Sequence, residues 1–337
     1  MLAPAITLDA ALRDIGSEQL RHRTKATDNI AAALLGELDK PGPLWRACDE
    51  HPRGADVRQA LLGLLDDQQP PPLRGAAAVA LGMLGEPTMF ERTARWSQLD
   101  GDGEDRAYLR QCSVIAASFL GRAAIDAEAD EPLLLQIRER IETAMSAEAP
   151  DLRFQAGIAL VEIQGAAAEP TLVAALREES HPQAREALVE ALAYLDPPGE
   201  QACNALESIV EGPEGVEGLG FRAAMVLAAG RRPSARPRLV AGLALRHERD
   251  DALEALAALG GGDRSEMERV HRLARRVFLP GITRVRAAYA LARMAPQGSA
   301  DNPGMALLER LRWHPRPAVR EAVADAFKNL DNLTASD

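Results

Sequence analysis

The sequence predicts an all-α protein built as a right-handed α-solenoid, a superhelix of stacked helical hairpins. Three observations predict this class. First, the 337 residues include 63 Ala and 45 Leu, the strongest helix formers, whereas aromatic residues make up only 4%. Second, one motif recurs at intervals of about 35 residues. Third, Pro or Gly falls between most of the predicted helices. A large β-sheet, a doubly wound α/β fold and a disulfide-stapled domain are therefore disfavoured.

Each predicted repeat is marked by an arginine followed by small and apolar residues at helical spacing. Residues 73–85 give the clearest copy, and Arg249 begins a degenerate one. Successive arginines are 36, 43, 32, 37, 27, 37 and 34 residues apart, which fits two short helices and two turns. The 43-residue interval holds an acidic insertion at residues 126–131, which we expect to form a longer loop. The regular copies begin with the anchor arginines Arg74, Arg110, Arg153, Arg185, Arg222, Arg286 and Arg320.

Two copies show the motif most fully: Val-Arg-Ala-Ala-Tyr-Ala-Leu at residues 285–291 and Leu-Arg-Gly-Ala-Ala-Ala-Val-Ala-Leu-Gly at residues 73–82. Over residues 55–330 the pattern resembles the HEAT-repeat family, in particular the bacterial HEAT-like repeats named after phycobilisome lyases. The resemblance implies that the second helix of each hairpin lines a concave face. It also implies that the anchor arginines bond carboxylates or carbonyls of neighbouring repeats. A His-Pro turn precedes three of the Arg helices, at His51, His181 and His314.

The organisation along the chain follows from these repeats. Residues 1–66 are less regular, and we predict an irregular helical N-terminal cap in which residues 24–38 form a helix. Residues 67–331 make up the predicted repeat array, and residues 332–337 a frayed tail. The predicted second helices are residues 88–98, 131–146, 168–178, 199–211, 235–246, 263–278 and 303–313.

The two ends of the chain differ in charge. Residues 1–218 hold 19 basic and 37 acidic side chains, whereas residues 219–337 hold 20 and 13. The array is thus predicted to be an electric dipole. The same division appears in the predicted second helices, which are acidic in the middle of the chain and basic toward its end. A candidate acidic strip consists of Glu169, Glu178, Glu179, Glu200, Glu207 and Glu211. A candidate basic strip consists of Arg236, Arg238, Arg246, Arg264, Arg269, Arg272, Arg275 and Arg276.

The predicted helix at residues 263–278 carries the densest basic cluster. Arg269, Arg272 and Arg276 are spaced i, i+3 and i+7, so they share one face and offer forked donors suited to carboxylate or phosphate groups. The alternative is a solvated basic face with Glu266 and Glu268 as local partners. The predicted apolar stripe of this helix is Met267, Val270, Ala274 and Val277.

Motifs for catalysis, metal binding and cofactor binding are missing from the sequence. It contains no HExxH, CxxC, P-loop or GxSxG pattern, and the three cysteines lie far apart. HEAT-type deoxyhypusine hydroxylases bind iron through several His-Glu pairs, but only His247-Glu248 occurs here. Trp45, Trp96 and Trp313 lie in different repeats of a chain with net charge −11, which disfavours nucleic-acid binding by base stacking. Partly buried packing is the expected role of each tryptophan.

The sequence therefore predicts a non-catalytic scaffold or adaptor that binds a protein partner along the concave face. We expect no metal, no cofactor, no nucleic acid and no membrane partner. The start of the chain does not resemble a signal peptide, which favours a cytoplasmic location, and the excess of 36 Arg over 3 Lys suggests a GC-rich bacterial genome. Two alternatives stay open: a lyase-type accessory that binds a cofactor such as a bilin, and a nucleic-acid binder that uses the basic C-terminal repeats.

Overall fold

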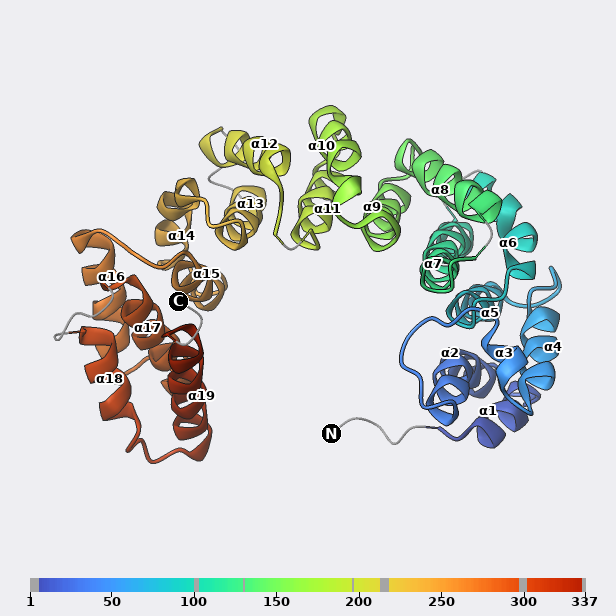
Figure 1. The fold of residues 1–337 in the computed structure, drawn as a ribbon, viewed down its shortest axis with the longest axis horizontal. Helices are drawn as coiled ribbons and strands as arrows, with labels where there is room; N and C mark the ends of the chain where they lie inside the picture. Colours follow the sequence, from blue (N-terminus) through green and yellow to red (C-terminus); the bar gives the residue numbers. More distant parts are fainter. Residues whose placement is uncertain are drawn as a thin grey trace. The chain divides into compact units, whose positions relative to one another are not determined.

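A computed structural model describes residues 6–99, 103–129, 131–195, 197–212, 218–296 and 302–334. Within these ranges every regular element is a helix (Figure 1), which confirms the all-α prediction. The chain forms two compact units, Met1–Ala191 and Leu192–Asp337. The boundary falls inside α11 (Pro182–Ala193), and each unit is described separately.

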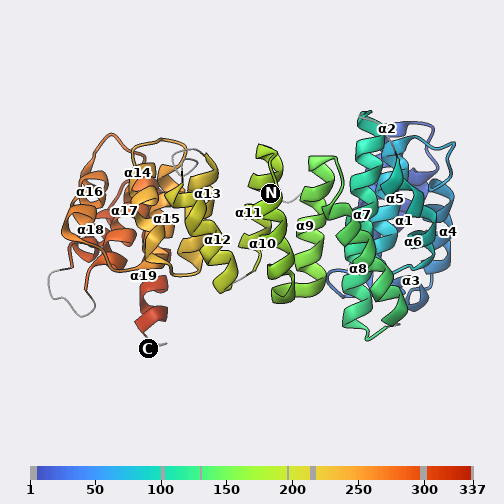
Figure 2. The same ribbon diagram turned by 90° about the horizontal axis from the view of Figure 1, so that it is seen from above.

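Unit 1 repeats a simple arrangement in which first helices, many with an anchor arginine, alternate with second helices. The first helices α2, α5, α7 and α9 contact one another in order, and Figure 2 shows α7, α8 and α9 lying side by side. The helices are α1 (Leu8–Ile15), α2 (Leu20–Glu37), α3 (Ala47–Glu50), α4 (Gly54–Leu64), α5 (Pro71–Met83), α6 (Thr88–Thr93), α7 (Glu104–Asp126), α8 (Glu131–Met145), α9 (Pro150–Gln164) and α10 (Glu169–Glu178).

Unit 2 continues the same alternation. The first helices α13, α15, α17 and α19 contact one another in order, and α16 and α18 each pack on α17. The helices are α12 (Glu200–Glu211), α13 (Gly218–Ala229), α14 (Arg236–Gly242), α15 (Arg249–Leu259), α16 (Arg264–Arg275), α17 (Gly281–Met294), α18 (Pro303–Leu311) and α19 (Pro317–Thr334).

Small residues determine which helix layer is the more closely packed. On α5 the buried residues include four alanines and Gly82, and a Cβ on Gly82 would lie 2.4 Å from the carbonyl oxygen of Ala116 on α7. Within each unit the first helices lie on the inner side of the curve and the second helices on the outer side (Figure 1). The expectation that second helices line the concave side is therefore wrong within each unit.

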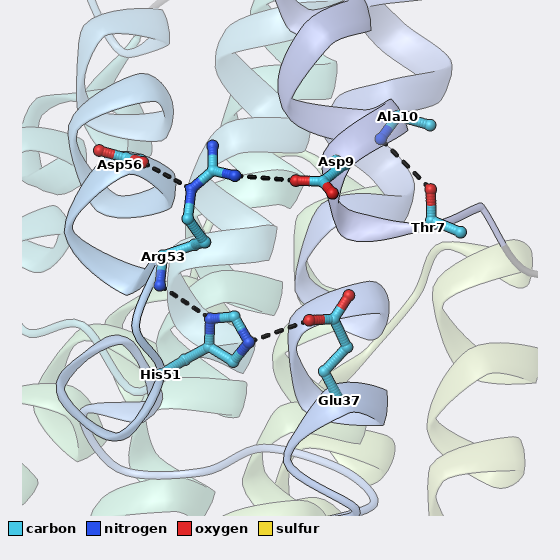
Figure 3. A network of polar contacts seen from close by, with 7 residues as sticks. All are labelled: Thr7, Asp9, Ala10, Glu37, His51, Arg53 and Asp56. Carbon is cyan, nitrogen blue, oxygen red and sulfur yellow. Dashed lines mark hydrogen bonds and ion pairs between the residues drawn. The ribbon is translucent and has the colours of Figure 1, made fainter.

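A polar network joins the N-terminal helices α1, α2 and α4 of unit 1 (Figure 3). The Arg53 guanidinium donates to Asp9 on α1 and to Asp56 on α4, both at 2.8 Å. The backbone N–H of Arg53 donates to Nδ1 of His51 at 3.0 Å, so the proton lies on Nε2, which is 3.0 Å from Glu37 on α2. The His-Pro turn at residue 51 thus fixes the entry to α4.

Several predicted boundaries shift. The 43-residue interval is not accommodated by a long loop, because α7 itself extends to 23 residues. The predicted second helix at 235–246 shortens to α14, preceded by a 3-10 turn, Pro233–Ala235. The helix predicted at 263–278 ends at Arg275. Part of the predicted frayed tail is helical, because α19 continues to Thr334, while residues 335–337 lie outside the described part.

Candidate functional site

Four of the arginines that mark the repeats bind backbone carbonyls in the turn that precedes their own helix. Carbonyls beyond the end of a helix need partners from outside that helix, and a guanidinium donor supplies them. The observed pairs are Arg153 with Ala147 O (2.6 Å) and Glu148 O (2.7 Å), Arg249 with Leu243 O (2.8 Å), Arg320 with His314 O (2.9 Å), and Arg110 with Leu99 O (2.7 Å).

Other anchors bind carboxylates. Arg286 on α17 lies 3.0 Å from both Asp250 and Glu254 on α15, the first helix of the preceding repeat. Arg74 pairs with Asp67 and lies over the buried ring of Trp96. Arg185 and Arg222 also engage other groups. The observed contacts of these anchors are thus made within the fold.

Arg153 makes the most extensive contacts of the set. Besides its two carbonyls, its guanidinium binds both carboxylate oxygens of Glu179, which lies in the turn before α11. The side chains are 15% and 8% exposed. Burial opposes ionisation of Glu179, but the His181 N–H and the Arg153 guanidinium outweigh it and hold the pKa of this carboxyl below its ordinary value. One arginine thus joins α8, α9 and the start of α11.

Two members of the candidate basic strip are not surface groups, which corrects the prediction. Arg238 is 7% exposed and makes two 2.8 Å hydrogen bonds to Glu248, with the Phe221 ring 5.0 Å away. Arg236 binds the carbonyl of Gly260 and the carboxylate of Glu266. Arg238 thus faces Phe221 on α13 and Glu248 before α15, whereas Arg236 joins the end of α15 to the first turn of α16.

The remaining strip residues are exposed, namely Arg246, Arg264, Arg269, Arg272, Arg275 and Arg276. Arg264 pairs with Glu268 at 3.1 Å, and Arg272 reaches the backbone carbonyl of Glu268 at 3.4 Å. Within the described residues, Arg269, Arg275 and Arg276 form no ion pair. The exposed face of α16 is therefore basic, and much of its charge is left without a partner.

The end of α16 differs from the sequence prediction in a second way. Val277 was expected in the buried stripe, but the helix stops two residues earlier and Val277 is 76% exposed. Phe278 is 102% exposed. Trp313 was expected to be partly buried, yet it is 85% exposed in the turn between α18 and α19. Tertiary packing buries Trp96, as expected, and leaves Trp313 in solvent.

The acidic strip divides between the units. In unit 1, Glu178 and Glu179 join Glu142 around a pocket of about 550 Å³ that Arg153 also lines. Because Glu179 is held by Arg153, it is not a free surface carboxylate, which corrects the prediction for that residue; Glu169 is half-buried and also engaged. In unit 2, Glu200 pairs with Arg232, Glu207 accepts a 2.8 Å hydrogen bond from Ser234, and Glu211 is exposed.

Possible metal ligands and thiols occur in the described part of the chain. No three His, Cys, Asp or Glu side chains there lie close enough to hold a metal ion. The three cysteines are buried and unpaired, and burial raises the pKa of Cys48 and of Cys112 to about 11, which suppresses the reactive thiolate.

One stretch, Pro150–Glu178, is long and apolar enough to cross a membrane by length and composition alone. Buried core helices of other proteins pass the same test. In the structure the stretch is α9 and α10, separated by a 3-10 turn, Gly165–Ala168, in which Gly165 has φ +55°.

Comparisons with known proteins identify the fold. No family model and no curated protein sequence matches the chain. Among solved structures, the Escherichia coli protein YibA matches with a TM-score of 0.54 and 14% identity, covering 86% of this chain and 92% of its own. Kap121p bound to Pho4p matches with a TM-score of 0.57 and 14% identity, covering 96% of this chain and 37% of Kap121p. The protein therefore has the fold of a HEAT-like helical-repeat solenoid.

A third match concerns the lyase alternative. The complex of CpcE and CpcF of phycocyanin lyase from Nostoc covers 92% of this chain with 20% identity, but its TM-score is only 0.34. Similarity at this level supports no conclusion about activity.

Proposed function

We propose that the protein is a cytoplasmic, non-catalytic scaffold that binds a protein partner, and that the exposed face of α16 is a principal contact. The observation that carries this proposal is the group of exposed arginines on one short helix. Arg269 forms no ion pair within the described residues, and the Arg272 guanidinium reaches only a backbone carbonyl. By contrast, Arg153 and Arg238 are held by ion pairs within the fold.

The chemistry of this face defines the partner. Guanidinium groups donate in forked pairs that match carboxylates, so an acidic segment fits best. Capping-box hydrogen bonds between Asp263 and Glu266 fix the start of α16, so the face is presented on a rigid helix. Electrostatic contacts of this kind raise the rate of encounter and select the partner by sign.

The fold supports a scaffold in a general way. A solenoid of helical hairpins offers a long surface made of similar units, which suits contact at several points. Kap121p, a karyopherin with this fold, is seen bound to Pho4p and to the extreme C-terminus of the protein phosphatase Cdc14p. The acidic pocket around Glu142 and Glu178 offers a second contact, for a basic group of a partner.

The test compares three proteins as bait in nuclease-treated lysate of the source organism: wild type, Arg269→Glu/Arg272→Glu, and the control Arg138→Glu. Arg138 is an exposed arginine on α8 of unit 1. We expect wild type and control to retain a stoichiometric protein, identified by mass spectrometry, that the double variant loses and that high salt weakens.

Three results contradict the proposal. Retention of the same partner by the double variant shows that the α16 face is only solvated. If a parallel sample without nuclease yields nucleic acid and no protein, and the binding of that nucleic acid falls steeply with salt, the nucleic-acid alternative is favoured. Recovery of a coloured small molecule alone favours the lyase-type accessory.

A further inference from the structure

Three successive turns of unit 2 expose apolar side chains next to arginines. Each of these turns joins a second helix to the next first helix, so all three lie at the same end of their hairpins. The turn after α14 exposes Leu245 beside Arg246, and the turn after α18 exposes Trp313 beside Arg312. The turn between them, after α16, exposes the run Arg275, Arg276, Val277 and Phe278.

Contacts between the helices show that the three turns are neighbours. The Thr283 hydroxyl in the first turn of α17 lies 3.3 Å from Asp250 in the first turn of α15. A Cβ on Gly281 would lie 2.6 Å from Cγ2 of Val319 and 3.6 Å from the ring of His314. The starts of α15, α17 and α19 are thus in contact, and the turns that precede them form one continuous edge.

The aromatic residues of this edge protrude rather than line a groove. Phe278 is fully exposed and Trp313 nearly so, while Val277 and Ile282 extend the apolar surface between them. Aromatic side chains that anchor a protein–protein contact fill well-packed pockets once the complex has formed. Side chains that project from adjacent turns suit a soft apolar phase, and Trp is enriched where such a phase meets water.

Basic side chains dominate the charge of this edge. Arg246, Arg275, Arg276 and Arg316 are exposed and form no ion pair within the described residues, while Arg312 pairs with Glu309 at 3.4 Å. The corresponding turns of unit 1 are different: they carry Asp66, Asp67, Glu148 and Glu179. None of the exposed large apolar residues of the described part of unit 1 lies in those turns.

We propose that this edge, defined by Leu245, Val277, Phe278, Ile282 and Trp313 with the flanking arginines, docks unit 2 on the surface of an anionic lipid bilayer. The aromatic tips enter the interface between headgroups and acyl chains, and the arginines bind anionic headgroups. Peripheral attachment of this kind needs both contributions, apolar burial and basic charge. A scaffold attached in this way would hold its protein partner at the membrane surface.

The experiment measures sedimentation of the purified full-length protein with vesicles of phosphatidylcholine alone, or of three parts phosphatidylcholine to one part phosphatidylglycerol. We expect binding to the anionic vesicles at least about tenfold stronger than to the neutral ones, falling as salt is added. The variant Phe278→Ser/Trp313→Ser should lose at least about tenfold in partitioning, because each aromatic ring offers on the order of 150 Å² of apolar surface to the bilayer. Arg275→Gln/Arg276→Gln should lose about fivefold per arginine, on anionic vesicles only.

A matched control carries the same types of change in unit 1. Leu135 and Arg122 are both exposed there, so Leu135→Ser/Arg122→Gln should bind vesicles like wild type. Since all substituted side chains are exposed, unchanged circular-dichroism melting verifies that each variant folds.

Two outcomes overturn the proposal. Wild type that stays in the supernatant with anionic vesicles, or edge variants that bind as wild type does, shows that the edge does not bind membranes. If wild type fails to bind vesicles and Phe278→Ser/Trp313→Ser also loses the nuclease-resistant protein partner, the edge is a protein-docking surface instead. The vesicle assay contains no partner protein, so its failure leaves the test of the α16 face unaffected.

Discussion

Replacing Arg153 by Met should destabilise unit 1 by about 3 kcal/mol. The substitution keeps the apolar stem but removes four hydrogen bonds, two to Glu179 and two to the carbonyls that end the preceding hairpin. Removing one partner of a buried ion pair costs about 3–5 kcal/mol, because the other charge stays buried without its counter-charge. We take the lower end, because the Arg153 side chain is 15% exposed and the His181 N–H still donates to Glu179 at 2.8 Å.

The assay is thermal and urea unfolding of wild type, Arg153→Met, Glu179→Gln and the double variant. For a unit of this size, 3 kcal/mol corresponds to a fall in Tm of about 6–12 °C. Glu179→Gln should cost less, because the amide oxygen still accepts from Arg153, and the double variant should cost less than the sum. Arg177→Met, at an exposed position on α10, serves as the control and should change stability by less than about 0.5 kcal/mol. Equal stability of Arg153→Met and Arg177→Met would refute the reasoning.

Three further predictions concern packing, exposure and pH. Gly82→Ala should lower the free energy of unfolding in urea by about 1–3 kcal/mol, because the new Cβ meets the α7 backbone. Gly36→Ala on α2, where nothing lies within 4 Å of the new Cβ, should raise it by up to about 1 kcal/mol. Changes of the same sign in both variants would contradict the packing argument. Arg286→Ala should cost less than about 1 kcal/mol and less still at high salt, because its two ion pairs are over a third exposed; a cost above 2 kcal/mol would show that they are not solvent-screened. Because the pKa of Glu179 is lowered in the folded protein, its ionised carboxylate stabilises the fold at neutral pH, and this contribution is lost as the pH falls below the ordinary pKa of 4.5. When the urea midpoint is measured as a function of pH, Glu179→Gln should therefore lose less stability in acid than wild type does.

The repeat pattern predicted the helices well because it follows local rules. The Ala-rich stretch after Arg74 and the Pro residues at the start of α5, α9 and α18 gave the positions of the helices to within a few residues. The sequence pattern predicted the lengths of individual helices less accurately than their positions. Nothing local shows that α7 continues as far as Asp126, because the alternatives differ only in what the extra helical turns pack against.

The candidate site shows where local reasoning ends. By sequence, Arg238 and Arg269 are equivalent members of a basic strip, but Glu248 and Phe221 enclose one, and solvent surrounds the other. The membrane-docking edge has the same origin. Val277 fits the apolar spacing of α16, and only the end of the helix at Arg275 places it and Phe278 outside the core.

By itself, the sequence determined the fold class, the repeat length and the opposite charge of the two ends, because helix propensity, periodicity and composition are properties of neighbouring residues. Only the tertiary structure decided which layer of helices packs closely, which arginines are consumed by ion pairs, and which apolar residues remain in solvent. Those outcomes depend on contacts between residues far apart in the sequence, as between Arg153 and Glu179, which are 26 positions apart and which no local pattern specifies.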